Sequence, residues 1–278
     1  QIVAANGLSD KIVLIRSKVE ELQWPSDIPP ADIIISEWMG YALLYESMYA
    51  SVLFARDKFL RKGGRVFPDK SELFVRACEG ATVYKERVQF WEDSVYGFDM
   101  SQNVNMAYLN LVAEPQVRHE TQEADMLTAA CSLQLFDLER QAEREFEFSQ
   151  TIQLSFTRNG MFRAFCIYFT STFNSSVQKV LNTKPGAPYT HWKQTYLWIK
   201  NPVKVTAGQT GTFHMAFLRE GRELKIVISG TLQAGTSAGE ASTTGQDSLD
   251  VGADDDLPPL ADTSATNIAH ISGSWLLS

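Results

Sequence analysis

The chain has 278 residues, of which 44% are hydrophobic and 21% charged, as in a soluble globular protein with one large domain or two modest ones. No run approaches the roughly 18 apolar residues that a membrane span needs, and the first residues lack a signal-peptide pattern, so we expect a cytoplasmic or nuclear protein. The net charge is −8, but seven acidic residues after Lys225 account for −7 of it. No basic patch indicates a nucleic-acid partner.

The first 67 residues alternate between apolar runs and helix-prone segments. KIVLIRS (11–17) predicts a strand, KVEELQ (18–23) is helix-prone, and ADIIISE (31–37) is typical of a buried parallel strand. An apolar residue recurs every three or four positions from Met48 to Phe59, which predicts a helix that ends at Gly63-Gly64. This alternation predicts part of a doubly wound, Rossmann-like α/β sheet over residues 1–67.

Residues 68–278 have a different sequence pattern, in which short runs rich in Phe, Tyr, Ile and Val follow one another. They predict an antiparallel β-barrel or sandwich, with Asn159-Gly160 as a two-residue hairpin turn. The strand-like runs are SELFVRAC, SLQLFDL, FSQTIQLSF, FRAFCIYFTSTF, YLWIK, TFHMAF, LKIVISG and NIAHISGSWLL. The three cysteines lie in or beside such runs and predict buried thiols rather than disulfides or a metal site.

Two segments of this region stand apart. In residues 81–115, Tyr84, Val88, Trp91 and Tyr96 lie near one helical face, which could pack on the chain's own barrel or on a second subunit. Residues 234–266 consist mainly of Gly, Ala, Ser, Thr and Asp, a composition that cannot bury enough apolar surface to fold. We expect a flexible acidic loop that joins the last two strands.

The stretch SEWMGYALLYES (36–47) places Glu37 and Glu46 in an otherwise uncharged loop at the carboxyl end of a strand. Two carboxylates in a poorly hydrated pocket repel each other unless a cation lies between them. Guanidinium fits best, because its planar donors can contact two carboxylates at once. A pair of acids for glycoside hydrolysis, or one glutamate near a helix start with the other in solvent, are the alternatives.

SEWMGYALLYESM (36–48) resembles the double-glutamate loop of the protein arginine methyltransferases. YTHWKQ (189–194) is similar to the threonine-histidine-tryptophan loop of that family, and VFPD and VYGFDMS also match. The matches run in the family's order from the first residue to about Lys225. This resemblance, closest to the type I enzymes, implies methyl transfer from S-adenosylmethionine to a guanidino nitrogen of arginine in arginine- and glycine-rich proteins. Monomethyl and asymmetric dimethylarginine are the implied products.

The resemblance also implies roles for individual residues and no metal ion. The implied catalytic residues are Glu37, Glu46 and His191, and the implied substrate-binding residues are Trp38, Tyr41 and Trp192. The implied contacts of S-adenosylmethionine are Val19, Glu20, Met48 and Ser51. Residues 81–115 would form a dimerisation arm that docks on a neighbouring subunit in a head-to-tail homodimer.

The chain departs from the family pattern at its start. The glycine-rich turn after the family's first strand and the acidic residue after its second strand have no counterpart here, and neither does the usual acidic partner of the histidine. We therefore expect these residues alone to bind S-adenosylmethionine weakly and to be inactive. A catalytically inactive paralogue that regulates an active partner, and a module that binds arginine-rich motifs without a cofactor, remain alternative functions.

Overall fold

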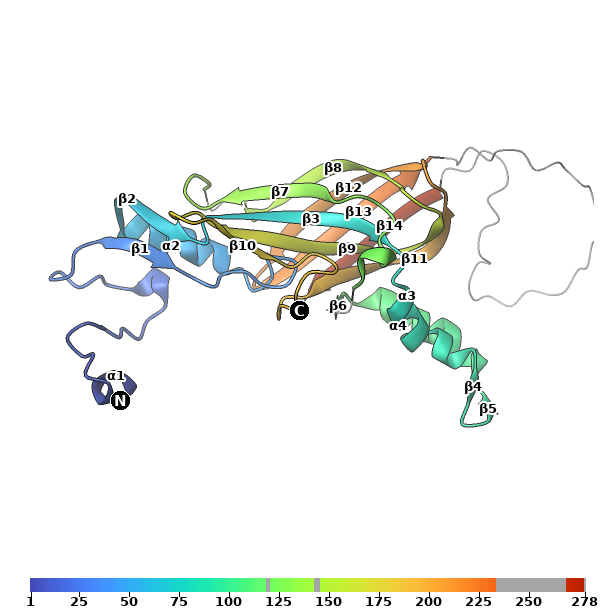
Figure 1. Cartoon of the computed structure of the whole chain (residues 1–278), viewed down its shortest axis with the longest axis horizontal. Coiled ribbons are helices and arrows are strands. Elements are labelled where there is room, and N and C mark those ends of the chain that lie inside the picture. The colour runs from blue at the N-terminus through green and yellow to red at the C-terminus, as the bar shows by residue number, and fades with distance from the viewer. Residues whose placement is uncertain (119–120, 143–145, 234–268, 278) are drawn as a thin grey trace, which may run out of the picture.

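The computed structural model describes residues 1–118, 121–142, 146–233 and 269–277. Two antiparallel sheets lie face to face, with a small α/β part at one end and a projecting arm at the other (Figure 1). Within the described residues no helix is long and apolar enough to span a membrane. The same residues contain no group of three or more His, Cys, Asp or Glu side chains placed to hold a metal ion.

The α/β part agrees with the predicted strand–helix–strand order but differs in two details. Its elements are α1 (Ile2–Ala5), η1 (Val19–Glu21), β1 (Ala31–Ile35), α2 (Met48–Phe59) and β2 (Leu60–Phe67). β1 and β2 pair in parallel, with Ile35 opposite Phe67. The predicted strand at 11–17 is wrong: this run has no regular structure, and β1 pairs with β2 instead of with it. A strand is stable only when a neighbour takes up its backbone donors and acceptors.

The predicted glycine stop of α2 is also wrong. The helix ends at Phe59 because Leu60 adopts an extended conformation, with φ −80° and ψ 133°. Gly63 and Gly64 then lie inside β2, in the irregular stretch between the pairs Ala31–Leu60 and Ile33–Arg65, and Gly63 has a φ of 75°. Pairing with the neighbouring strand therefore outweighs the helical periodicity at this point.

The larger sheet has the strand order β6-β11-β9-β3-β7, with β10 paired to β9. Its strands are β3 (Lys70–Cys78), β6 (Gln116–Arg118), β7 (Cys131–Asp137), β9 (Gly160–Phe173), β10 (Lys179–Asn182) and β11 (Gln194–Val205). The second sheet has the order β14-β13-β12-β8, from β8 (Phe148–Ser155), β12 (Thr210–Glu220), β13 (Glu223–Leu232) and β14 (Ala269–Leu277). The architecture is thus α/β plus antiparallel β, as the sequence predicts.

The hairpin predicted at Asn159-Gly160 is not formed. β8 pairs with β12 in one sheet, whereas β9 pairs with β3 and β11 in the other, so residues 156–159 cross between sheets. The last two strands, β13 and β14, are neighbours, with Leu232 opposite Ala269. The acidic segment predicted between them at 234–266 lies outside the described residues.

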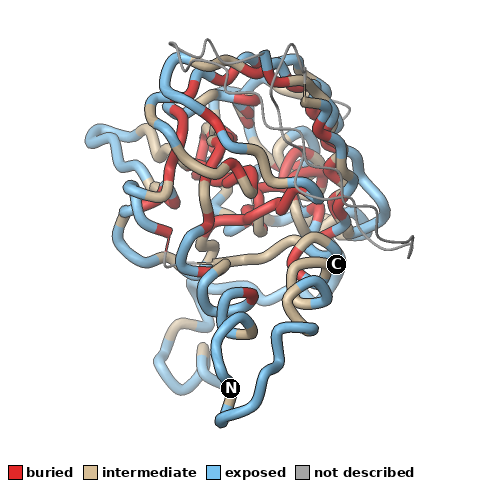
Figure 2. Tube along the Cα trace, turned by 90° about the vertical axis from the view of Figure 1, so that its right-hand side faces the viewer, coloured by how far each residue is buried: buried red, intermediate tan, exposed pale blue. Residues whose placement is uncertain are grey.

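Aromatic side chains from both sheets form the core between them. Figure 2 shows that buried residues gather in the interior of the sandwich. Phe213 of β12 lies 5.2 Å from the ring of Phe165 and 6.1 Å from that of Phe162, both on β9. All three are fully buried. Trp38, Leu43 and other residues of the loop after β1 belong to the same core, so the sandwich anchors that loop.

The arm spans α3 (Ala81–Arg87), η2 (Gln89–Trp91), β4 (Ser94–Val95), β5 (Phe98–Asp99), η3 (Ser101–Asn103) and α4 (Val104–Ala113). η4 (Glu123–Asp125) follows β6. The arm's base packs on its own sheet, because Val83, Val88 and Leu111 share a buried cluster with Tyr196 and Trp198 of β11. Its tip projects away from the sandwich (Figure 1).

Candidate functional site

The loop between β1 and α2 carries both glutamates of the predicted site. Leu43 and Leu44 are buried in the core, whereas Glu37 and Glu46 are exposed. Glu46 and Ser47 have positive φ angles of 76° and 57°, a left-handed conformation that costs free energy for any residue but glycine. Contacts from elsewhere in the chain must hold this backbone in place.

His191 and Glu37 are adjacent although they come from different domains of the predicted organisation. Nε2 of His191 lies 3.4 Å from Oε1 of Glu37, and the His191 ring packs on Trp192 at a centroid distance of 3.8 Å. The indole N–H of Trp192 donates a 2.7 Å hydrogen bond to the carbonyl of Met39. The threonine-histidine-tryptophan segment thus contacts the double-glutamate loop, as a shared site requires.

Glu46 is held by a third segment that the sequence does not single out. Its backbone N–H donates to the carbonyl of Arg222 at 3.1 Å, and the Ser47 hydroxyl donates to the carbonyl of Gly221 at 3.2 Å. Among the described residues, no hydrogen bond or ion pair joins the Glu46 carboxylate to Glu37 or His191. The binding of one guanidinium by both glutamates therefore stays a prediction.

The two aromatic residues predicted in this loop lie in different surroundings. Trp38 is 1% exposed and packs against Tyr49, at a centroid distance of 5.3 Å. Tyr41 is half-buried and its ring lies parallel to that of Tyr45, 6.1 Å away. Trp38 thus belongs to the core beneath the loop, and Tyr41 lies nearer the surface.

The residues predicted to contact the cofactor gather where η1 meets α2. The Ser51 hydroxyl donates a hydrogen bond to Oε1 of Glu20, and this bond, helped by a backbone bond and by Lys18, lowers the pKa of the Glu20 carboxyl. Val19 precedes Glu20 in η1, and the exposed Met48 begins α2. An ionised carboxylate there can accept hydrogen bonds from the hydroxyl or amino groups of a nucleoside.

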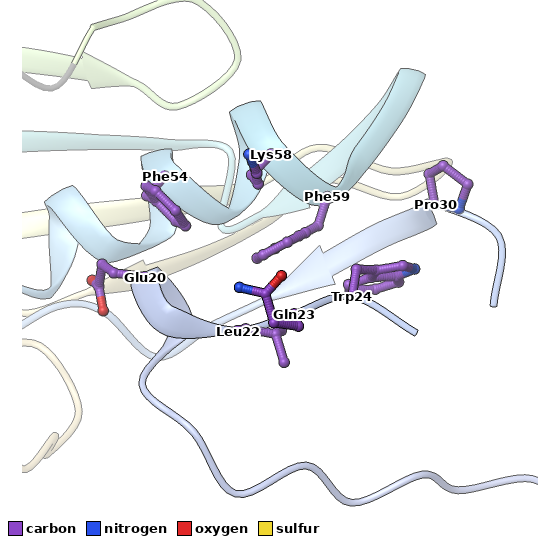
Figure 3. Close-up of a pocket in the computed structure, with 8 residues that line it drawn as sticks. All are labelled: Glu20, Leu22, Gln23, Trp24, Pro30, Phe54, Lys58 and Phe59. Carbon is purple, nitrogen blue, oxygen red and sulfur yellow. The ribbon is translucent and has the colours of Figure 1, made fainter. Parts of the chain in front are cut away.

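A pocket of about 300 Å³ opens beside Glu20 (Figure 3). Its walls include the rings of Trp24 and Phe59, stacked at a centroid distance of 5.1 Å. The lining residues are Glu20, Leu22, Gln23, Trp24, Pro30, Phe54, Lys58 and Phe59. Glu20 is the one predicted cofactor contact among these lining residues, and neither predicted catalytic glutamate is among them.

The chain is similar to known proteins over most of its length. The profile of the arginine methyltransferase oligomerization subdomain matches residues 69–233. A probable protein arginine N-methyltransferase 1.2 of Arabidopsis thaliana is 38% identical over 84% of this chain and 62% of its own length. Protein arginine N-methyltransferase 1 of Caenorhabditis elegans is 39% identical over 82% of this chain and 66% of its own. The chain thus spans somewhat less than two thirds of these relatives.

One solved structure is similar in fold. It is the Trypanosoma brucei PRMT1 enzyme-prozyme heterotetrameric complex with AdoHcy, which is 29% identical, has a TM-score of 0.74, and is matched over 100% of this chain and 77% of its own. The family profile covers more than half of the 278 residues, and the two signature loops meet in space. The chain belongs to the protein arginine methyltransferase family.

Proposed function

We propose that the protein transfers a methyl group from S-adenosylmethionine to a guanidino nitrogen of arginine in arginine- and glycine-rich proteins. Monomethyl and asymmetric dimethylarginine are the proposed products. The observation that carries this proposal is that Glu37 lies beside His191, and that Trp192 is hydrogen-bonded to Met39, in a chain of this family. The relatives named above as arginine N-methyltransferases support the same reaction class.

Two features support an adenosine-containing cofactor. Glu20, held by Ser51, offers a carboxylate that can accept hydrogen bonds from the hydroxyl or amino groups of a nucleoside, and a pocket with aromatic walls opens beside it. When bound, S-adenosylmethionine supplies an electrophilic methyl group on a sulfonium. Val19, Glu20, Met48 and Ser51 are the proposed contacts of this cofactor.

The protein's own task is to hold and polarise the substrate arginine. Removing a proton from a guanidinium in advance at pH 7 would cost about 7 to 9 kcal/mol, because its pKa is about 12.5 to 13.8. A carboxylate clamped on the guanidinium instead draws positive charge toward itself and leaves electron density on the nitrogen that faces the methyl group. We assign the main clamp to Glu46.

Glu37 is the proposed second clamp and the proposed proton acceptor. Its neighbour His191 lies on the sandwich side of the site, where a charged imidazole would hold the Glu37 carboxylate in place. Trp192 would position this histidine by packing against its ring and by a hydrogen bond to the loop that bears Glu37. Tyr41 is the proposed aromatic neighbour of the guanidinium, and Trp38 is proposed to shape that site from the core beneath the loop.

The test replaces each clamp by its uncharged isostere. Glu46→Gln and Glu37→Gln in the protein expressed from its complete coding sequence should each lower turnover at least ~10²-fold, as removal of a preorganised electrostatic group does. The measurement is transfer from labelled S-adenosylmethionine to an arginine- and glycine-rich peptide, with mass analysis of the product. Glu114→Gln, at an exposed position after α4, is the matched control and should keep parental turnover.

Three results would contradict the proposal. Turnover within a few-fold of the parent in either variant would remove the assigned roles. Peptide binding without any methyl transfer would indicate a binding module. Methyl transfer only after a second, active family member is added would indicate a regulatory paralogue.

A further inference from the structure

The double-glutamate loop is fastened to the sandwich at two places. Near its start, the Trp192 indole N–H donates to the Met39 carbonyl. At its end, Glu46 and Ser47 are bonded to the turn between β12 and β13, which is 174 residues away in sequence. The second fastening lies at the residue that the proposed mechanism uses as its main clamp.

The geometry of this turn explains the contact. Glu220 pairs with Glu223, so Gly221 and Arg222 form a two-residue hairpin loop. Gly221 has a φ of 68°, and a positive φ at the first loop residue is typical of a type II′ turn. This conformation directs two successive carbonyls at the loop: that of Arg222 accepts the Glu46 N–H and that of Gly221 accepts the Ser47 hydroxyl.

Ser47 and Arg219 complete the junction. The Ser47 side chain is buried with its residue only 6% exposed, so its hydroxyl has little water to bond instead. Nε of Arg219 also donates to the Gly221 carbonyl, at 3.1 Å. The Gly221 carbonyl thus accepts two donors, one from the loop and one from its own hairpin, which fixes the turn against the loop.

The backbone of Glu46 and Ser47 is the part that needs support. Both residues have left-handed backbone angles, and in a free loop of this sequence they would move to a more favourable region of φ/ψ space. Rotation of φ at Glu46 would swing its Cα–Cβ bond and redirect the carboxylate. A contact that fixes this φ therefore also fixes the direction of the Cα–Cβ bond from which the carboxylate extends.

We propose that the Gly221-Arg222 turn, acting through Ser47 as a positioning residue, fixes the left-handed backbone at Glu46 and so sets the direction of the Cα–Cβ bond that carries its carboxylate. The inference deepens the proposed function, because it rests on Glu46 as a clamp. The turn itself need not touch substrate or cofactor.

A matched pair of glycine variants tests this inference. Gly221→Ala places an L side chain at φ 68°, and no atom lies within 4 Å of the added Cβ, so the change acts on turn geometry and not on packing. Gly208→Ala is the control, since Gly208 has φ 85°, is equally open, and lies in the turn before β12, at the strand's other end. Both variants should lose similar stability.

Hydrogen exchange measures local opening of the double-glutamate loop directly and does not require the protein to be catalytically active. In Gly221→Ala, the amides of a peptide covering residues 40–47 should exchange about tenfold faster than in the parent, as expected for a local opening that has become easier. In Gly208→Ala they should stay within about twofold of the parent. Ser47→Ala, which removes the hydroxyl but leaves the turn unchanged, should also accelerate exchange. Equal exchange in the two glycine variants would overturn the inference, whether or not the protein transfers methyl groups.

Kinetics then separate positioning from general damage. In an active parent, Gly221→Ala should lower kcat about tenfold or more, as a misplaced catalytic group does, while KM for S-adenosylmethionine stays unchanged because Glu20 and Ser51 are untouched. Gly221→Asn should keep more of kcat than Gly221→Ala, because asparagine is among the residues that primed turns take at positive φ. Accelerated exchange with an unchanged kcat would also overturn the inference. A parent that transfers no methyl group would refute the proposed function alone.

Discussion

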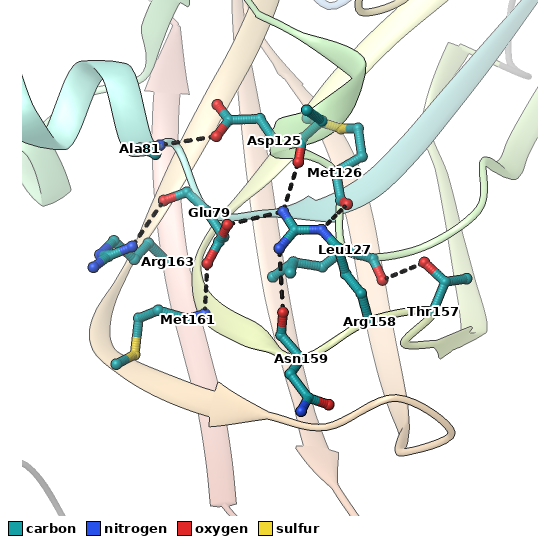
Figure 4. Close-up of polar contacts among 11 residues, drawn as sticks. Glu79, Ala81, Asp125, Met126, Leu127, Thr157, Arg158, Asn159, Met161 and Arg163 are labelled. Atoms are coloured by element: carbon teal, nitrogen blue, oxygen red, sulfur yellow. Dashed lines mark hydrogen bonds and ion pairs between the residues drawn. The ribbon is translucent and has the colours of Figure 1, made fainter.

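Glu79 is the half-buried acid at the junction of β3 and the arm (Figure 4). Its Oε1 accepts the backbone N–H of Met161 at 3.0 Å and its Oε2 accepts Nη2 of Arg158 at 2.8 Å. Burial alone would raise the pKa of this carboxyl, but the two bonds and the nearby guanidinium charges outweigh burial and leave the pKa below its ordinary value. The ionised form therefore stabilises the fold.

Glu79→Gln should lower the free energy of unfolding at pH 7 by about 1 kcal/mol, because a charge-assisted hydrogen bond is replaced by a neutral one. The folded-state pKa is lowered, so the stabilisation is fully present above the unfolded pKa and is lost as pH falls through the folded pKa. The gap between variant and parent should be constant from pH 7 to about pH 5 and shrink below an unfolded pKa of about 4.3. Urea midpoints at each pH measure it. A gap that persists undiminished at the most acid pH at which both proteins fold would disprove this account.

At the scale of elements, the arm has two unlike parts. Its base is buried against β11. Its tip exposes large apolar side chains: Phe90 is 48% exposed, Tyr96 93%, Phe98 69% and Met106 61%. Exposed apolar side chains gathered on one projecting element are typical of an interaction surface. We propose that this tip docks on a second copy of the chain in a head-to-tail homodimer.

Replacing Tyr96 and Phe98 together by aspartate should abolish that association, because each charge would have to be buried in an apolar contact. Sedimentation should show the parental dimer and a monomeric variant of unchanged fold. Val180→Asp, at a 54% exposed position on β10, should remain dimeric. A doubly substituted variant with the mass of the parent assembly would place the interface elsewhere.

At the scale of the whole molecule, strand β14 of the second sheet is separated in sequence from its neighbour β13 by residues 233–268. β14 pairs with β13 along its full length, from Leu277 opposite Leu224 to Ala269 opposite Leu232. The ends that a connection must bridge are therefore next to each other.

Replacing residues 234–268 by Asn-Gly-Thr should preserve the fold, since Asn-Gly suits a two-residue hairpin loop and Thr would face Gln233. Shortening the connection should raise the free energy of unfolding by up to about 2 kcal/mol through loop-closure entropy. Urea unfolding measures this, with a Gly/Ser linker of the original length as the control that keeps the parental value. A variant that no longer unfolds cooperatively would refute it.

The sequence predicts which segments form strands better than it predicts their partners. Alternating residues identify β8, which buries one face, and a long apolar run identifies β9, which is buried on both faces. Neither pattern shows which sheet a strand joins, so the prediction of a hairpin at Asn159-Gly160 is wrong. At the site, residue types and two signature loops can be recognised from sequence alone. The bonds from Trp192 to Met39 and from Glu46 to Arg222 cannot, because they join residues more than 150 positions apart and leave no local pattern.

The position of the arm has a consequence for how two copies of the chain would influence each other. The arm projects at one end of the sandwich, whereas β1 and α2, which bound the double-glutamate loop, lie at the other (Figure 1). In the proposed head-to-tail homodimer, the arm tip of one copy would therefore lie against the end of its partner that carries this loop. A change at the tip would then be transmitted to the loop of the partner and not to the loop of the same chain.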